Sequence, residues 1–107
     1  MTDYSKVPDY EINARVGESL GMTAHFIEHD GRVKFRDEKG KIQGTKDYCN
    51  NPSDAWPIIV ENKISVNYWR AGRLEADRYG CHTARDENPL RAAMICFLMM
   101  KDAEKKC

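Results

Sequence analysis

The hydrophobic positions near the start of the chain recur at the spacing of a helix. Ile12, Val16 and Leu20 fall at i, i+4 and i+8, so their side chains share one stripe of a helical surface. Asp9 is placed to cap this helix at its amino end, and Gly21 is placed to terminate it. The segment therefore predicts an amphipathic helix with one buried face.

Hydrophobic and polar residues then alternate over residues 23–35, which is the period of a β-strand. Asp30-Gly31 is the strongest short-range hairpin signal in the chain. It predicts a turn that joins residues 25–29 to residues 32–36. A further turn follows, and Ile42 is expected to begin a short edge strand.

The same alternation returns over residues 63–69, and Ala71-Gly72 predicts a turn into a partner strand at residues 73–79. Both hairpins are expected to join one mainly antiparallel sheet of about four to five strands. With about three helices, the chain is predicted to be an α+β protein.

Two Asn-Pro pairs predict helix starts. Asn51-Pro52 and Asn88-Pro89 each put a capping side chain before a proline at the first helical position. Pro57 either begins the second helix or bends it, because it lacks a backbone donor. Trp56 is followed three and four positions later by apolar residues, which predicts a core anchor.

The last helix is predicted to run from Pro89 to about Glu104, and residues 92–100 are apolar on every side. A sheet alone cannot cover such a helix in a small domain. Two interpretations stay open, burial between layers or an interface with a partner. The candidate interface residues are Trp69, Ile95, Met99 and Met100.

Composition limits the class of protein. A chain of 107 residues with 41% hydrophobic content fits one domain over residues 1–107, with a charged tail at 101–107 expected to fray. The 17 basic and 17 acidic residues give zero net charge, so nucleic-acid binding would depend on a local patch.

Neither the amino terminus nor the longest apolar run looks like a membrane or export signal. Residues 92–100 would span about 14 Å as a helix, whereas a bilayer core needs about 30 Å. The four cysteines are Cys49, Cys81, Cys96 and Cys107, and their wide spacing argues against a disulfide scaffold or zinc ribbon. We expect a protein of the cytoplasm with no membrane association.

Three segments resemble a known family. They are Asp9 to Asn13 (DYEIN), Asn51 to Asn62 (NPSDAWPIIVEN) and Asn88 to Ala93 (NPLRAA), and they resemble the NinX-like proteins of lambdoid phages and prophages. The resemblance implies an α-β-α sandwich-like fold and a phage or prophage accessory protein of unknown function in the bacterial cytoplasm. It implies no site residues and no cofactor.

Three residue groups have ligand types found in metal sites. His25 and His29 would lie about 13 Å apart on a strand, too far to share a metal. Cys81 and His82 lie in a loop near Asp86 and Glu87, and Cys49 would have to complete a mixed site. Ordinary loop and surface positions are the competing interpretation, so we predict no metal.

Glu75 and Asp77 alternate on a strand, so their carboxylates would lie about 6.6 Å apart on one face. That separation suits a divalent cation or an acid/base pair, but an exposed edge strand has the same pattern. A small metal-dependent hydrolase using these residues and His82 is therefore a remote alternative. Phosphate-loop, nucleophile-elbow and H-E-x-x-H motifs are absent from the sequence.

The densest cationic grouping lies in the second half of the chain, close to Tyr68 and Trp69. Guanidinium groups beside a stackable ring suit phosphates and bases, although four acidic residues interrupt the grouping. The candidate nucleic-acid contacts are Arg70, Arg73, Arg78, Arg85 and Arg91.

The leading hypothesis from the sequence is a non-catalytic protein-interaction module. Its partner would be an unidentified phage or host protein, or a second copy in a homodimer. Nucleic-acid binding through the region from Arg70 to Arg91 is the alternative.

Overall fold

The computed structural model describes residues 4–70, 73–78 and 82–105, and its α+β class confirms the prediction. A short 3-10 helix, η1, precedes three α-helices and six strands within these ranges. In chain order the elements are η1 (Tyr4–Lys6), α1 (Asp9–Ser19), β1 (Thr23–Ile27), β2 (Val33–Arg36), β3 (Ile42–Lys46), α2 (Pro52–Glu61), β4 (Ser65–Arg70), β5 (Arg73–Arg78), β6 (His82–Asp86) and α3 (Pro89–Lys105).

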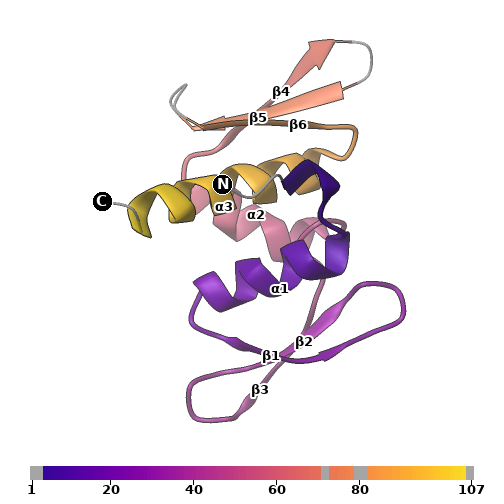
Figure 1. Cartoon of the computed structure of the whole chain (residues 1–107), viewed down its shortest axis with the longest axis vertical. Helices are drawn as coiled ribbons and strands as arrows, with labels where there is room; N and C mark the ends of the chain where they lie inside the picture. The colour runs from indigo at the N-terminus through magenta and orange to yellow at the C-terminus, as the bar shows by residue number, and fades with distance from the viewer. Residues whose placement is uncertain (1–3, 71–72, 79–81, 106–107) are drawn as a thin grey trace.

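The strands form two separate antiparallel sheets, β1-β2-β3 and β4-β5-β6, with the helices between them (Figure 1). The expectation of one sheet holding both hairpins was therefore wrong. The expected α-β-α layering is also reversed, since helices form the middle layer. The reason is the last helix, which needs cover on several sides and so separates the second sheet from the first.

Helix α1 ends in a Schellman motif, as the position of Gly21 predicted. Gly21 has φ +91, its N–H donates to the Glu18 carbonyl, and the Met22 N–H donates to the Gly17 carbonyl. At the other end Pro8 is the cap and Asp9 is the first helical residue. The expected capping role of Asp9 was therefore wrong by one position, and its carboxylate is used elsewhere.

The first sheet follows the predicted hairpin and adds β3 at its edge. Val33 and Phe35 of β2 are fully buried against α1. Gly17 of α1 lies directly against the sheet, because a Cβ there would lie 2.2 Å from a ring carbon of Phe35. The absence of a side chain at Gly17 thus sets the spacing between helix and sheet.

Helix α2 begins as predicted, with the Asn51 side chain accepting from the Ser53 N–H at 3.0 Å and Pro52 in the first turn. It continues through Pro57 to Glu61. The predicted burial of Trp56 was wrong, because its side chain is 61% exposed. The helix buries Ala55, Ile58 and Ile59 instead, so its apolar stripe is offset from Trp56.

The second sheet contains a strand where the sequence predicted a loop. His82–Asp86 pairs with β5 and makes β5 the central strand. The expectation that Glu75 and Asp77 lie on an edge strand was therefore wrong. Ala76 and Ala84 are buried in this sheet, and all three strands pack against α3.

Helix α3 is covered on several sides by the second sheet, α1 and α2. Asn88 caps it as predicted, its Oδ1 accepting from the Leu90 N–H at 3.0 Å. Ile95 and Met100 are 5% and 3% exposed, so their surplus apolar surface is already buried within the chain. The helix continues beyond Lys101 to Lys105, into the segment expected to fray.

None of the helices that the structure describes is long and apolar enough to cross a membrane.

Candidate functional site

Arg91 is the centre of a polar cluster where the amino ends of α1 and α3 meet. Its Nη1 lies 2.7 Å from Asp9 Oδ1, and its Nε lies 3.0 Å from Asp86 Oδ2. Its Nη2 donates to the carbonyls of Val7 at 2.6 Å and Tyr4 at 3.1 Å. The side chain is 11% exposed, so the guanidinium joins η1, α1, β6 and α3 in a largely dry environment.

The cluster continues through Asn13, which is fully buried in α1. Its Nδ2 donates to Asp47 Oδ1 and to the Gly31 carbonyl, each at 3.0 Å. Its Oδ1 accepts from the Cys49 N–H, also at 3.0 Å. One amide therefore satisfies polar groups of the first hairpin and of the loop before α2.

Two further asparagines close the cluster. Asn50 Nδ2 lies 3.2 Å from Asp9 Oδ2 and 3.2 Å from Asp47 Oδ1. Asn88 Nδ2 donates to the Cys49 carbonyl at 2.7 Å. The carboxylates here are engaged by donors from the chain itself, which is the arrangement of a structural network.

Cys49 lies inside this cluster but is not an activated nucleophile. Burial, with a smaller contribution from the nearby Asp9 carboxylate, raises the pKa of its thiol to about 12. The thiol is therefore protonated at neutral pH, whereas nucleophilic attack and metal binding require the thiolate. Cys49 and Cys96 are both buried free cysteines.

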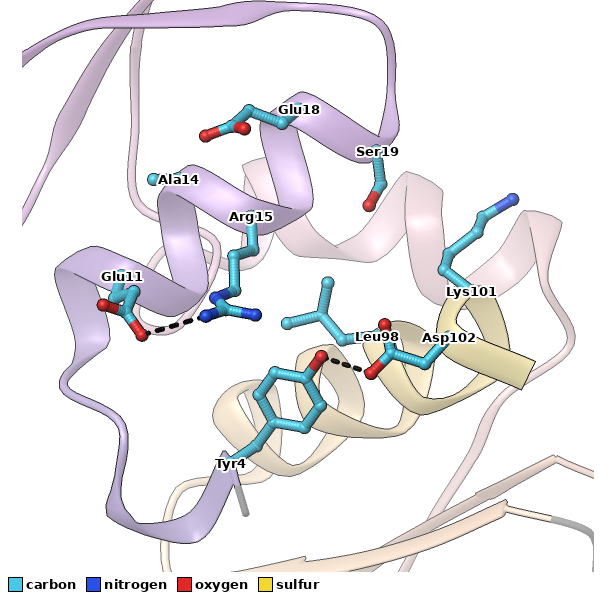
Figure 2. Close-up of a pocket in the computed structure, with 9 residues that line it drawn as sticks. All are labelled: Tyr4, Glu11, Ala14, Arg15, Glu18, Ser19, Leu98, Lys101 and Asp102. Atoms are coloured by element: carbon cyan, nitrogen blue, oxygen red, sulfur yellow. Dashed lines mark hydrogen bonds and ion pairs between the residues drawn. The ribbon is translucent and has the colours of Figure 1, made fainter. Parts of the chain in front are cut away.

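A groove of about 800 Å³ lies between α1 and α3 (Figure 2). Leu98 and the ring of Tyr4 lie between its charged groups, and Arg15 sits 5.7 Å from the ring centroid. The Tyr4 hydroxyl donates to Asp102 Oδ2 at 2.5 Å. Burial, followed by this hydrogen bond, raises the pKa of Tyr4.

Several charged side chains of this groove are paired with other side chains of the groove. Arg15 pairs with Glu11 at 3.4 Å, and Asp102 is engaged by Tyr4. With a raised pKa, Tyr4 is a poor general base at neutral pH. The mixed charges of the groove select no ligand class.

The outer face of α2 carries an exposed apolar pair. Trp56 is 61% exposed and Val60, one turn later, is 56% exposed. This surface could not be predicted from the sequence, because Trp56, Ile59 and Val60 at i, i+3 and i+4 also fit a core stripe. In the structure Ile59 is 4% exposed, so only part of the stripe is buried.

A family model described as "Bacteriophage P22, NinX" matches residues 3–101. The chain belongs to the NinX family. The resemblance found in the sequence is thus confirmed, and the chain is a phage-type protein of a family with unknown function. No curated protein and no solved structure matches it.

The three segments that resemble this NinX family meet in the polar cluster. Asp9 and Asn13 come from the first, Asp54 from the second, and Asn88 and Arg91 from the third. Asp54 Oδ2 accepts from the Asp47 N–H at 3.0 Å. Most of the polar residues in these segments therefore have a structural role, whereas Trp56 in the middle segment points to solvent.

Of the five arginines proposed as nucleic-acid contacts, only Arg91 has a side chain that the structure describes. Arg91 is held by Asp9 and Asp86. Arg70 and Arg73 pair across one end of β4 and β5. The structure places the backbones of Arg78 and Arg85 in β5 and β6; the side chains of these two residues, of Arg70, Arg73 and of Trp69 lie outside the description.

The metal candidates are not brought together in the part of the chain that the structure describes, and no group of three or more His, Cys, Asp or Glu side chains there could hold an ion. His25 Nε2 lies 3.3 Å from Arg36, and Asp86 is paired with Arg91. Cys81 and Cys107 lie outside the described residues, as do the side chains of Glu75, Asp77 and His82.

Proposed function

We propose that this phage protein is a non-catalytic interaction module that binds another protein through the outer face of α2. The observation that carries the proposal is the exposure of Trp56 beside Val60, at 61% and 56%. Tryptophan is among the residues that contribute most to binding energy at protein interfaces. An exposed aromatic-aliphatic pair on a rigid helix is typical of such an anchor.

This site replaces the surface on α3 that the sequence suggested. Ile95 and Met100 pack inside the chain and Met99 is partly buried, so α3 has little apolar surface left for a partner. Helix α2, in contrast, packs its inner face on α3 and leaves Trp56 outward. A second copy of the chain is the partner to test first, followed by phage and host proteins.

The non-catalytic part of the proposal is supported by the chemistry of the polar groups. The Cys49 thiol is protonated at neutral pH. Asp47 accepts a hydrogen bond from Asn13, and Asp9 and Asp86 form ion pairs with Arg91. These groups hold helices together, which leaves them poorly suited to acid/base work.

The test compares Trp56→Ala with Tyr10→Ala, a control that removes an aromatic ring 42% exposed on α1. Size-exclusion chromatography with light scattering on reduced protein measures self-association, and affinity capture from lysate of phage-infected bacteria measures other partners. We expect the wild type and Tyr10→Ala to form a dimer or to bind one specific partner protein. The affinity of that association should be at least about tenfold lower for Trp56→Ala.

Both variants change exposed side chains, so their melting temperatures should stay close to that of the wild type. A companion or dimer that survives Trp56→Ala and Val60→Asp would contradict the assignment to α2. A wild-type monomer without any companion would contradict the interaction function itself.

A further inference from the structure

The first sheet has an outer face that no described helix covers. Helix α1 packs on the face that holds the buried Val33 and Phe35 (Figure 1). Side chains alternate between faces along a strand, so Lys34 and Arg36 of β2 belong to the opposite face. Following the strand register outward, the face consists of Thr23, Phe26, Lys34, Arg36, Ile42 and Thr45.

This outer face combines exposed apolar side chains with cations. Phe26 is 55% exposed and Ile42 is 54% exposed. Phe26 is the direct cross-strand partner of Lys34, and Ile42 is the partner of Arg36. Each row of the face therefore places an apolar group next to a positive charge.

The guanidinium of Arg36 is held on the same face by its neighbours. Its Nη1 donates to the Gly40 carbonyl at 2.8 Å, and its Nη2 lies 3.3 Å from His25 Nε2. His25 occupies the irregular position between Ala24 and Phe26 in the strand register. The bulge thus turns the His25 ring toward Arg36.

Acidic residues are absent from the six positions of the face and occur instead in the turns at its ends. Asp30 pairs with Arg32 at 2.8 Å. Asp37 accepts from the backbone N–H groups of Lys39 and Lys41, each at 2.9 Å. The positive charges of Lys34 and Arg36 are therefore not neutralised by carboxylates on the face.

We propose that the outer face of the first sheet binds single-stranded nucleic acid. A base would stack on Phe26, and phosphates would contact Lys34 and Arg36. Several single-strand-binding domains use a sheet with an exposed aromatic ring beside cations in this way, because any unpaired base offers a ring face. The complementary charge favours a polyanion over a neutral peptide.

This surface differs from the region between Arg70 and Arg91 and from the outer face of α2. The chain has zero net charge, so its overall charge does not attract nucleic acid. Without a large overall field, attraction of a polyanion has to come from a local face.

The test is fluorescence anisotropy with labelled 20-nucleotide probes, namely oligo-dT, oligo-U and duplex DNA. We expect single strands to bind at low salt more tightly than the duplex, with affinity falling as salt rises. The two single-stranded probes distinguish DNA from RNA as the preferred strand. Phe26→Ala should weaken binding at least about fivefold, because it removes the ring on which a base stacks.

Matched variants separate stacking, charge and folding. Phe26→Tyr keeps a ring and should retain binding. Lys34→Gln should lower the slope of log affinity against log salt by about 0.7, the value for one phosphate contact on a single strand. Lys6→Gln, an exposed cation elsewhere, and Trp56→Ala should leave oligonucleotide binding unchanged.

Absence of an anisotropy change at low salt with both single-stranded probes would overturn the proposal. Oligonucleotide binding that is unchanged in Phe26→Ala and Lys34→Gln would also overturn it. So would a Phe26→Ala variant that no longer binds a partner protein, if no probe binds the wild type. Because Trp56→Ala tests the α2 surface and Phe26→Ala tests this one, the two proposals fail separately.

Discussion

Arg91 of α3 lies 2.7 Å from the carboxylate of Asp9 in α1, a residue 82 positions earlier in the chain. The pair fixes the amino end of the first α-helix against the amino end of the last. Asp9 is 40% exposed whereas Arg91 is 11% exposed, so the larger desolvation cost is borne by the arginine.

Arg91→Ala should destabilise the protein by about 3 kcal/mol, because Asp86 Oδ2, Asp9 Oδ1 and the Val7 carbonyl lose the guanidinium as their donor. Arg91→Lys keeps the charge but cannot reach all four acceptors, so a loss of about 1–2 kcal/mol is expected. Urea unfolding followed by circular dichroism measures both. A loss below about 1 kcal/mol for Arg91→Ala would mean that the cluster does not hold the helices together.

Gly17→Ala should destabilise the protein by about 1–3 kcal/mol despite the better helix propensity of alanine. The added Cβ would lie 2.2 Å from the Phe35 ring, so helix and sheet would have to separate. The double variant Gly17→Ala/Phe35→Leu should cost less than the sum of the two single changes. Strict additivity in this unfolding cycle would contradict the close contact.

Lys63→Gly should stabilise the protein by about 1 kcal/mol. Lys63 follows the end of α2 with φ 56, and its N–H donates to the Val60 carbonyl, the geometry in which glycine avoids the steric cost of a side chain. Lys63→Ala keeps that cost and is the control, with little change expected. Thermal unfolding of both variants decides the point, and equal melting temperatures would count against it.

Stability should fall as the pH rises from 9 toward 12. Burial raises the pKa of Cys49 from 9.0 to about 12, so the folded state keeps a proton that the unfolded state loses. The contribution is complete below pH 9 and is lost by about 12. Tyr48, raised from 10.0 to about 12, adds only above pH 10.

The interval from pH 9 to 10 therefore separates the contribution of Cys49 from that of Tyr48. The free energy of unfolding should fall there by up to about 1.4 kcal/mol per pH unit. Cys49→Ala should flatten this slope, whereas Tyr48→Phe should not. Denaturant unfolding at several pH values measures the slope, and an unchanged slope in Cys49→Ala would refute the assignment.

Local signals in the sequence were sufficient for the starts of α2 and α3 and for the first hairpin. Asn51 and Asn88 are caps because the side chain and the following proline act within one turn, and Asp30-Gly31 likewise acts locally. These features depend on neighbours in the chain, so a pattern of a few residues determines them.

Features that depend on distant elements were not predictable in this way. Trp56 was assigned to the core because periodicity defines a stripe but not which side of it meets α3. Strand β6 was missed because its residues, H-T-A-R-D, include only Ala84 as an apolar position. The separation of the sheets follows from the cover that α3 requires, which no single segment encodes.

The pairing within the polar cluster was also not predictable from the sequence. The segments around Asp9, Asn51 and Asn88 attracted attention by resemblance, yet nothing in their spacing indicated that Arg91 would pair with Asp9. Arg91 was counted instead among the candidate phosphate contacts, because a charged residue in a sequence carries no sign of its partner.

The central position of α3 has a consequence for synthesis. Both sheets precede this helix in the chain, and the second sheet packs its buried alanines directly on it. During translation the earlier elements emerge first, but the second sheet has no inner cover until the last described helix follows. We therefore expect the nascent chain to expose apolar surface to chaperones until α3 docks, and to gain protease resistance in one late step.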